Sequence, residues 1–380
     1  MKLSVEKNDL LNVIARAQNI VEKRNTMPIL VNVLLEAKGH GLRGFATDLE
    51  VSLTDEIQAN VKSTGRVAVN AKSLFEIIKE LPDGSIDLER KENNWLKITQ
   101  NRAVFNIVGI SPEEYPVFPT FTTQEFVKID SAVLAEMIEK TIYAVSTDET
   151  RYHLNGVYLE VRNEQEGAIY RMVATDGHRL SLIDRKIPDS TSRPVHQGVI
   201  IPRKGLHEIR KLLDNVEDSV EVAIEGAQLI VRRGTTVLMV RLIEGKYPNY
   251  QQLIPQNLRE HFLVQRDALL SSLKRVSLLS NAKSKGVTFA VTNGRMDITS
   301  NNPELGDAKE EIEVDYKGKD IKIGFNARYV LDVLSSMHED VVRIELNDHL
   351  SPGILRPNDD AYYTCVVMPM RIDEASTAPP

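Results

Sequence analysis

The sequence predicts an α+β protein made of three repeated domains, each with two helices packed on antiparallel sheets. The first observation is a stretch that occurs three times, at residues 3–21, 127–145 and 262–280. Each stretch is a short alternating run followed by an amphipathic helix, and Leu10, Leu134 and Leu269 align within it. The copies are therefore 124 and 135 residues apart. A repeat of such long period indicates that each copy is a full structural unit.

A second marker follows the first in every copy: two or three apolar strand residues, a break and a second helix. It occurs at 67–81, 199–213 and 323–337, where Leu74, Leu206 and Val330 align. Two markers in the same order make chance similarity an unsatisfactory explanation. Helices that pack on one side of antiparallel sheets define the α+β arrangement.

The remaining text of each copy is typical of β-strands, rich in branched side chains and punctuated by turn residues such as Gly39, Gly41 and Gly44. We expect roughly eight strands per domain, counting the short runs that open each marker. The others are predicted at 30–36, 42–47, 51–57, 85–89, 95–99 and 103–108; at 156–161, 169–174, 180–184, 220–224, 228–232 and 236–242; and at 286–292, 296–299, 310–315, 341–346, 353–356 and 361–368.

Proline-marked segments separate the copies. Tyr115-Pro116 and Phe118-Pro119 close the first copy and Tyr247-Pro248 closes the second, because proline cannot continue a helix and suits an extended connector. The predicted domains are residues 1–122, 127–256 and 259–372. Residues 373–380 are small, polar and proline-ended, and are predicted to form a disordered tail.

Composition places the chain among soluble globular proteins, with 42% hydrophobic and 27% charged residues. No apolar run approaches the roughly 20 residues that span a bilayer, and the first residues lack a signal-peptide core. The single cysteine, Cys365, excludes an internal disulfide and a cysteine-based metal cluster or redox pair. We expect a cytoplasmic protein with no membrane contact.

The distribution of charge is more informative than the net charge of −7. Six repeated helical stretches together carry a net charge of about +6, so the remaining residues carry about −13. A surface shared by these helices would have the sign needed to meet phosphate groups. The stretches counted are 7–24, 71–81, 131–145, 203–213, 266–280 and 327–337.

Catalytic chemistry finds little support. Phosphate-binding loops, zinc-protease helices and nucleophile elbows have no match in the sequence. In the best enzyme-like segment, Asp176 could orient His178 as a general base. However, Thr47-Asp48 and Ser300-Asn301 take the same place in the other copies without a following His, which favours a structural turn. We predict no catalytic residue, no metal and no cofactor.

Several segments resemble the bacterial β sliding clamp family, the processivity subunits of replicative DNA polymerases. The resemblance covers essentially the whole chain to Ile372. The segments that carry it are MKLSVEKNDLL at the start, Arg24 with 27–30, Arg151-Tyr152 with 154–156, the run 174–180, 324–326 with 329–332, and 366–371.

The resemblance implies three domains of the DNA-clamp fold and a head-to-tail homodimer that closes into a ring around duplex DNA. Such a ring slides because contacts to phosphates carry no sequence information. Its partners would be double-stranded DNA of any sequence, the catalytic subunit of the replicative polymerase, the clamp loader, and other polymerases and repair proteins that carry short linear motifs. The DNA contacts it implies are Arg24, Tyr152, Lys204, Arg210, Lys211, Lys274 and Arg275, and the dimer contacts are Phe105, Ile107, Leu278 and Leu279.

The resemblance also implies a peptide-binding groove between the second and third domains. Met, Val, Leu and Pro would form its adaptable apolar slot, and His178, Arg179 and Arg371 its polar edge. Carried over position by position, its residues are Leu154, Thr175, Gly177, His178, Arg179, Leu180, Pro248, Leu253, Asn326, Tyr329, Val366, Val367, Met368, Pro369, Met370 and Arg371.

The chain departs from the family pattern at several positions. Gln252 stands where some relatives carry Arg, and His153 replaces the second tyrosine of a pair near the DNA-facing loop. Ile372 replaces a terminal Leu and is followed by eight further residues. An alternative interpretation is a monomeric β-rich adaptor that binds peptides without closing a ring, and an enzyme is a third.

Overall fold

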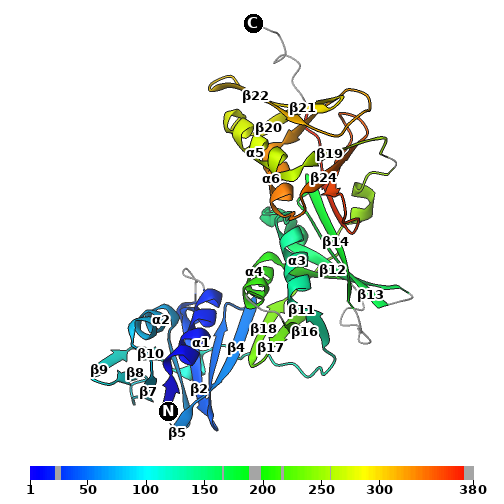
Figure 1. The fold of residues 1–380 in the computed structure, drawn as a ribbon. Coiled ribbons are helices and arrows are strands. Elements are labelled where there is room, and N and C mark those ends of the chain that lie inside the picture. The colour runs from blue at the N-terminus through cyan, green and yellow to red at the C-terminus, as the bar shows by residue number, and fades with distance from the viewer. Residues whose placement is uncertain (22–26, 165–166, 188–197, 215–217, 257, 372–380) are drawn as a thin grey trace. The chain divides into compact units, whose positions relative to one another are not determined.

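The computed structural model describes residues 1–21, 27–164, 167–187, 198–214, 218–256 and 258–371. Within them the same order of elements occurs three times, as the labels of Figure 1 allow the reader to follow. The first copy contains β1 (Lys2–Glu6), α1 (Lys7–Ile20), β2 (Asn32–Lys38), β3 (Gly41–Thr47), β4 (Val51–Gln58), β5 (Asn60–Ser63), β6 (Gly65–Asn70), α2 (Ala71–Glu80), β7 (Ser85–Arg90), β8 (Leu96–Gln100), β9 (Ala103–Ile107) and β10 (Gly109–Ile110).

Among the described residues, the other two copies repeat this order without strands equivalent to β5 and β10. The second contains β11 (Val127–Asp130), α3 (Ser131–Ile142), β12 (Gly156–Glu164), β13 (Gly167–Thr175), β14 (Arg179–Ile187), β15 (Val199–Pro202), α4 (Arg203–Leu212), β16 (Ser219–Glu225), β17 (Gln228–Arg233) and β18 (Thr236–Arg241). The third contains β19 (Glu260–Gln265), α5 (Arg266–Val276), β20 (Gly286–Thr292), β21 (Arg295–Asn302), β22 (Gly306–Glu313), β23 (Ile321–Asn326), α6 (Ala327–Ser335), β24 (Val341–Leu346), β25 (Gly353–Pro357) and β26 (Tyr363–Val367).

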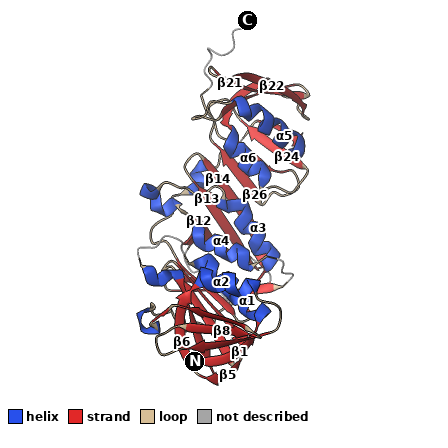
Figure 2. Cartoon of the chain, turned by 90° about the vertical axis from the view of Figure 1, so that its left-hand side faces the viewer, coloured by secondary structure: helices blue, strands red, loops and turns tan. Residues whose placement is uncertain are grey.

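The aligned apolar residues of the two sequence markers form the helix–sheet cores. Leu10, Leu134 and Leu269 are at most 6% exposed, and Leu74, Leu206 and Val330 are fully buried. The same spacing therefore places equivalent side chains in equivalent cores. Figure 2 shows α1 and α2 lying side by side on one face of the strands that follow them. The predicted α+β arrangement is confirmed.

Local chemistry sets where the second helix of a copy begins. The side-chain oxygens of Asn70 and Asn326 accept hydrogen bonds from the backbone N–H groups of Ser73 and Arg328, which caps the N-termini of α2 and α6. In the second copy α4 follows Pro202, which ends β15. A capping asparagine or a proline at the end of each apolar strand thus starts the second helix at the equivalent position of every copy.

The sheets run across the boundaries between copies. The fourth strand of one copy pairs antiparallel with the last strand of the next: β4 pairs with β18, with Val51 opposite Val240, and β14 pairs with β26, with Arg179 opposite Val367. The resulting sheets have the strand orders β10-β6-β2-β3-β4-β18-β17-β16-β11 and β15-β12-β13-β14-β26-β25-β24-β19. These pairings join adjacent copies through backbone hydrogen bonds.

Two strands lack such a partner among the described residues. In the first copy β9, the strand equivalent to β18 and β26, is an edge of the sheet β5-β1-β7-β8-β9. In the third copy β22, the strand equivalent to β4 and β14, is an edge of the sheet β22-β21-β20-β23. Because these equivalent strands pair with each other, the free edges of β22 and β9 are suited to pair in the same way.

The connectors between copies pack on the sheets that they cross. After β10, Tyr115 is buried against Leu30 and Leu34, and the ring of Phe118 contacts Phe45 edge to face with centroids 5.2 Å apart. In the second connector Tyr247 stacks on Tyr158 at 4.9 Å. The aromatic-proline segments are therefore part of the hydrophobic packing.

Three local predictions were wrong. The first strand after α1 begins at Asn32, because Pro28–Val31 forms a 3₁₀ turn. The strand predicted at 310–315 begins at Gly306, since β22 alternates polar and half-buried residues without an apolar run. The turn equivalent to Thr47-Asp48 is Asn301-Asn302, whose Asn302 accepts from the N–H of Glu304 as Asp48 does from Glu50.

The described residues cluster into two compact units rather than three. The first contains those within 1–132 and 204–242, and the second those within 133–189, 197–203 and 243–380. The second copy is divided between the units because its strands belong to two sheets. The domain limits 1–122, 127–256 and 259–372 therefore stay a prediction, and the tail 373–380 lies outside the described residues.

Candidate peptide-binding groove and charged helices

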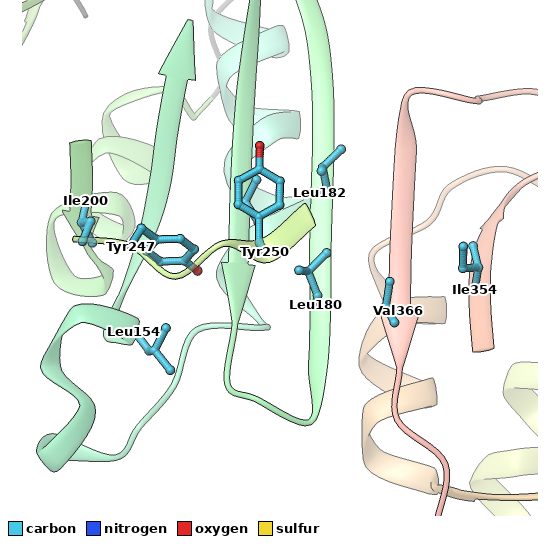
Figure 3. Packing of buried hydrophobic residues seen from close by; sticks show 9 residues of the cluster. Leu154, Leu180, Leu182, Ile200, Tyr247, Tyr250, Ile354 and Val366 are labelled. Carbon is cyan, nitrogen blue, oxygen red and sulfur yellow. The ribbon is translucent and has the colours of Figure 1, made fainter. Parts of the chain in front are cut away.

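A hydrophobic cluster within the second unit gathers residues that lie far apart in the sequence. Figure 3 shows Leu154, Leu180, Tyr247 and Tyr250 near one another, with Val366 on the neighbouring strand. All five are at most 6% exposed, and Leu253 packs against them partly buried. The pairing of β14 with β26, with Leu180 opposite Val366, produces this juxtaposition. The cluster forms an apolar floor to which four of the predicted groove residues contribute.

The turn between β13 and β14 borders this floor. The Thr175 hydroxyl donates to the carbonyl of Arg179 at 2.6 Å, and Asp176 Oδ1 accepts from the N–H groups of His178 and Arg179. Gly177 has φ +89°, a conformation that glycine adopts without strain. The Asp–Gly–His segment is therefore a turn held by its own hydrogen bonds.

The C-terminal segment forms the opposite border. The N–H of Met368 donates to the carbonyl of His178 at 2.9 Å, and the N–H of Met370 donates to the carbonyl of Gly324 at 2.8 Å. The side chains of residues 368–370 are half-buried and Arg371 is exposed. The ring of His178 stacks on Tyr329 with centroids 6.2 Å apart. An exposed histidine and a row of methionine and proline thus flank the apolar floor.

Arg179 is a structural residue and does not form the polar edge predicted for it. It is 7% exposed, and its guanidinium donates to Asp176 at 3.0 Å, Asp332 at 2.6 Å and the carbonyl of Tyr143 at 2.6 Å. The same group lies 4.7 Å from the centroid of the Tyr329 ring. Arg179 therefore ties the turn to α6 and holds Tyr329 beneath His178.

Replacing Arg179 with Lys is expected to lower the free energy of unfolding by about 1.5–3 kcal/mol. A lysine ammonium cannot donate to all three partners of the guanidinium at once. Peptide affinity should fall as well, since Tyr329 loses its support. Chemical denaturation measures the first effect and calorimetric titration the second. Arg295→Lys, at an exposed arginine, is the matched control; equal stability of the two variants would contradict this role.

The other predicted groove residues fall into three groups. Val366 belongs to the floor and Val367 is fully buried, so neither side chain forms an open wall. Pro248 is exposed beside the buried Tyr247. Asn326 caps α6 with its side chain. Sequence reasoning missed Tyr247 and Tyr250, although their aromatic-proline segment was a signal for packing.

A cation recurs at one position of the first helix in each copy: Arg16, Lys140 and Arg275. Arg16 donates to the buried Asp55 at 2.8 Å. Lys140 is 1% exposed and lies 3.0 Å from Glu136 and 2.9 Å from Glu339. Arg275 donates to Glu310 on β22 at 3.0 Å. At this position Arg16 and Arg275 tie the helix to β4 and β22, and Lys140 ties it to the segment that follows α6.

The predicted DNA contacts are dispersed over several helices, and most have an acidic neighbour. Arg24 lies outside the described residues. Tyr152 is 57% exposed, and Lys274 is exposed. The pairs are Lys204 with Asp48, Arg210 with Asp214, Lys211 with Glu208 and Arg275 with Glu310. The pairs of Arg210 and Arg275 are solvent-accessible and contribute at most about 1 kcal/mol each, so a phosphate can compete for these cations, whereas Asp48 and Glu208 are buried carboxylates.

The predicted dimer contacts lie on or beside the two edge strands β9 and β22. Phe105 is 37% exposed on β9, Ile107 is half-buried, and Leu278 is 76% exposed after α5. A cavity of about 360 Å³ lies beside Phe105 and is lined by Ile77 and Leu81. Exposed apolar side chains next to a free strand edge are typical of an interface.

The second unit also contains a buried polar cluster that is not built for reaction. The Cys365 thiol lies 3.1 Å from the Tyr143 hydroxyl, and burial raises the pKa of the thiol. A raised pKa keeps the thiol protonated and unreactive. In the part of the chain that the structure describes, no three His, Cys, Asp or Glu side chains could hold a metal ion together. None of the described helices is long and apolar enough to span a membrane.

Three copies of one two-helix unit, joined by strand pairing, define a protein of the three-domain clamp fold. Family models of the DNA polymerase III beta subunit match residues 1–119 (N-terminal domain), 128–249 (central domain) and 251–371 (C-terminal domain). The chain belongs to the family of DNA polymerase III beta subunits, the bacterial sliding clamps.

Similar proteins agree over almost their whole lengths. The beta sliding clamp of Caulobacter vibrioides is 36% identical over 375 residues, which is 98% of this chain and 100% of that protein. That of Pseudomonas putida is 35% identical over 380 residues, with the same coverage. A solved beta subunit from Caulobacter crescentus matches with a TM-score of 0.91 at 36% identity, covering 98% of this chain and 100% of that chain. A sliding clamp from Bartonella birtlesii bound to griselimycin matches with 0.93 at 31% identity and the same coverage.

Proposed function

We propose that two copies of the chain close head to tail into a ring around duplex DNA and act as the processivity factor of a replicative polymerase. The observation that carries this proposal is the repeated strand pairing. Since β4 pairs with β18 and β14 with β26, the same rule pairs β22 of one chain with β9 of a second. Head-to-tail contacts close when the repeated rotation completes a circle. Six domains would then surround the DNA.

The repeat also supplies a register for the joint between chains. The residue pair Arg233–Thr236 closes the hairpin before β18, and the pair Gln100–Ala103 closes the hairpin before β9. Matching these two pairs aligns β18 with β9. Asp55 on β4 and Glu310 on β22 pair with the equivalent cations Arg16 and Arg275, so these two carboxylates align β4 with β22. The two alignments together give four antiparallel residue pairs between the chains. They are Val104 with Lys309, Phe105 with Ala308, Asn106 with Asp307, and Ile107 with Gly306.

An internal contact supports Leu278 as the apolar anchor of this joint. By the spacing of the copies, Leu278 is equivalent to Tyr143 and Phe105 to Cys365. Tyr143 and Cys365 are in contact within one chain, 3.1 Å apart. The equivalent contact between two chains places Leu278 on Phe105, where the cavity lined by Ile77 and Leu81 can receive it.

In this ring the repeated helices face the DNA and meet its phosphates without reading bases. Their cations have acidic neighbours in the chain, so binding is weak and salt-sensitive, as sliding requires. The predicted contacts remain Arg24, Tyr152, Lys204, Arg210, Lys211, Lys274 and Arg275. No catalytic group is assigned, and the protein works in the cytoplasm, where the DNA is.

The groove would receive short peptides from the polymerase, the clamp loader and repair proteins. Its apolar floor and half-buried Met368 and Met370 suit one or two large apolar side chains. A monomeric adaptor would share the groove but would leave β9 and β22 unpaired. The mass of the native protein separates the two: a dimer supports the clamp, and a monomer at all accessible concentrations supports the adaptor.

Topology gives the most direct test of the clamp. Protein loaded onto a nicked circular plasmid should stay bound in high salt, because a closed ring cannot leave without opening, whereas free phosphate contacts are screened. Cutting the plasmid once should release it. Gel filtration of labelled protein before and after cutting measures both steps, and equal release from circular and linear DNA would contradict encirclement.

A further inference from the structure

One short segment of the second unit connects the groove with the proposed DNA contact. The 3₁₀ helix η3 (Glu149–Leu154) ends at Leu154, which is 5% exposed within the groove floor. Two residues earlier, Tyr152 is 57% exposed. Arg151 between its turns has φ −107° and ψ 52°, outside the helical region. The segment therefore contains a break immediately before Tyr152, and Tyr152 and Leu154 lie together on its C-terminal side.

The Arg151 side chain lies over the turn between β13 and β14, beside Gly177. A carbon placed at the Cβ position of Gly177 would lie 2.9 Å from Nη1 of Arg151, so the guanidinium covers that side of the turn. Its Nε donates to Asp148 Oδ2 at 3.0 Å. Hydrogen bonds from Thr150 and from Arg151 lower the pKa of Asp148, which keeps this partner ionised. The Arg151 side chain is thus held by Asp148 beside Gly177, at the border of the proposed peptide site.

Tyr152 lies against the connector that carries Tyr247 of the groove floor. A Cβ at Gly245 would lie 3.6 Å from Cε2 and 3.7 Å from Oη of Tyr152. Gly245 is two residues before Tyr247, whose ring is part of the floor, and three before Pro248. A displacement of Tyr152 would therefore act on the groove from two sides, through η3 and through the connector.

We propose that η3 couples the two sites, so that duplex DNA at Tyr152 draws Arg151 away from Gly177 and raises the affinity of the groove for peptide. This rests on the proposed function and adds a regulation to it. The Arg151 guanidinium pairs with the exposed carboxylate of Asp148, an interaction that contributes about 1 kcal/mol or less. A duplex phosphate offers Arg151 a stronger partner. By linkage, peptide raises DNA affinity by the same factor.

The test measures the dissociation constant of a fluorescent peptide carrying adjacent Leu and Phe side chains, by anisotropy, with the full-length protein. The titration is done without DNA and with a saturating short linear duplex that can thread the ring. For the unmodified chain the duplex is expected to tighten peptide binding about fivefold or more. The reverse titration, duplex binding with and without peptide, should give the same factor.

Two variants locate the coupling. Arg151→Ala should bind peptide without DNA as tightly as the unmodified chain does with DNA, and duplex should then change nothing. Arg295→Ala, which removes an exposed arginine of the same unit, should retain the full factor. Coupling that persists in Arg151→Ala, or duplex that weakens peptide binding, would overturn the proposal.

The same titrations distinguish this inference from the function on which it rests. Peptide that binds no form of the protein refutes the groove, and duplex that binds no form refutes the DNA contact; either result overturns the coupling as well. If peptide and duplex both bind the unmodified chain independently, only the coupling through η3 is refuted.

Discussion

Changing Leu278 and Leu279 together to Asp is expected to give a folded monomer. Leu278 is 76% exposed and Leu279 is half-buried in the single chain, so the fold does not depend on them. In the proposed joint each Leu is buried, and losing two such side chains costs about 3–6 kcal/mol before the added charge is counted. That is a loss of roughly a hundredfold to ten-thousandfold or more in dimer affinity. Sedimentation equilibrium measures it.

The control for this variant is Leu350→Asp, which places the same charge at a leucine that is 67% exposed in a turn. It should remain dimeric. A second measurement tests the register: Asn106→Cys combined with Asp307→Cys should give a disulfide between chains under mild oxidation, because opposed strand residues lie within bridging distance. A double Leu variant that stays dimeric would remove Leu278 and Leu279 from the joint.

Deleting residues 368–380 is expected to abolish peptide binding and polymerase stimulation while leaving the dimer. The deletion removes Met368 and Met370, whose N–H groups fasten the segment to His178 and Gly324. The groove then loses one border, and a short peptide depends on burying one or two apolar anchors of roughly 1.5–3 kcal/mol each. Calorimetric titration of the peptide measures the loss.

Deleting only residues 373–380 is the matched control. That tail has no large apolar side chain, so peptide affinity should change little. Circular dichroism of both forms confirms that β26 is retained, since it ends at Val367. If the longer deletion binds peptide as well as the full chain does, the groove lies elsewhere.

The sequence predicted the repeated architecture because the signal was redundant. Leu10, Leu134 and Leu269 are predicted and found at the same place in their cores, since a buried helix face tolerates few substitutions of size. The convergence of Leu154, Leu180 and Val366 in one buried cluster was also within reach. The DNA contacts, the dimer contacts and all of the groove assignments stay predictions.

What the sequence could not supply depends on partners in space. Arg179 resembles any arginine near a turn until Asp332, far along the chain, is placed beside it. Lys204 fits a phosphate contact by composition, but its partner is Asp48 of the preceding copy. The strand β22 escapes pattern recognition because an edge strand need not bury a continuous apolar face.

The pairing of β4 with β18 and of β14 with β26 has a kinetic consequence for the proposed ring. These joints are intramolecular and are crossed by packed connectors, whereas β9 and β22 must meet from separate chains. If one of the two joints between chains breaks, the other keeps the parted ends near each other at a high effective concentration. Reclosure is then independent of protein concentration and faster than escape of a subunit. The assembly can open to admit DNA many times for each time that it falls apart.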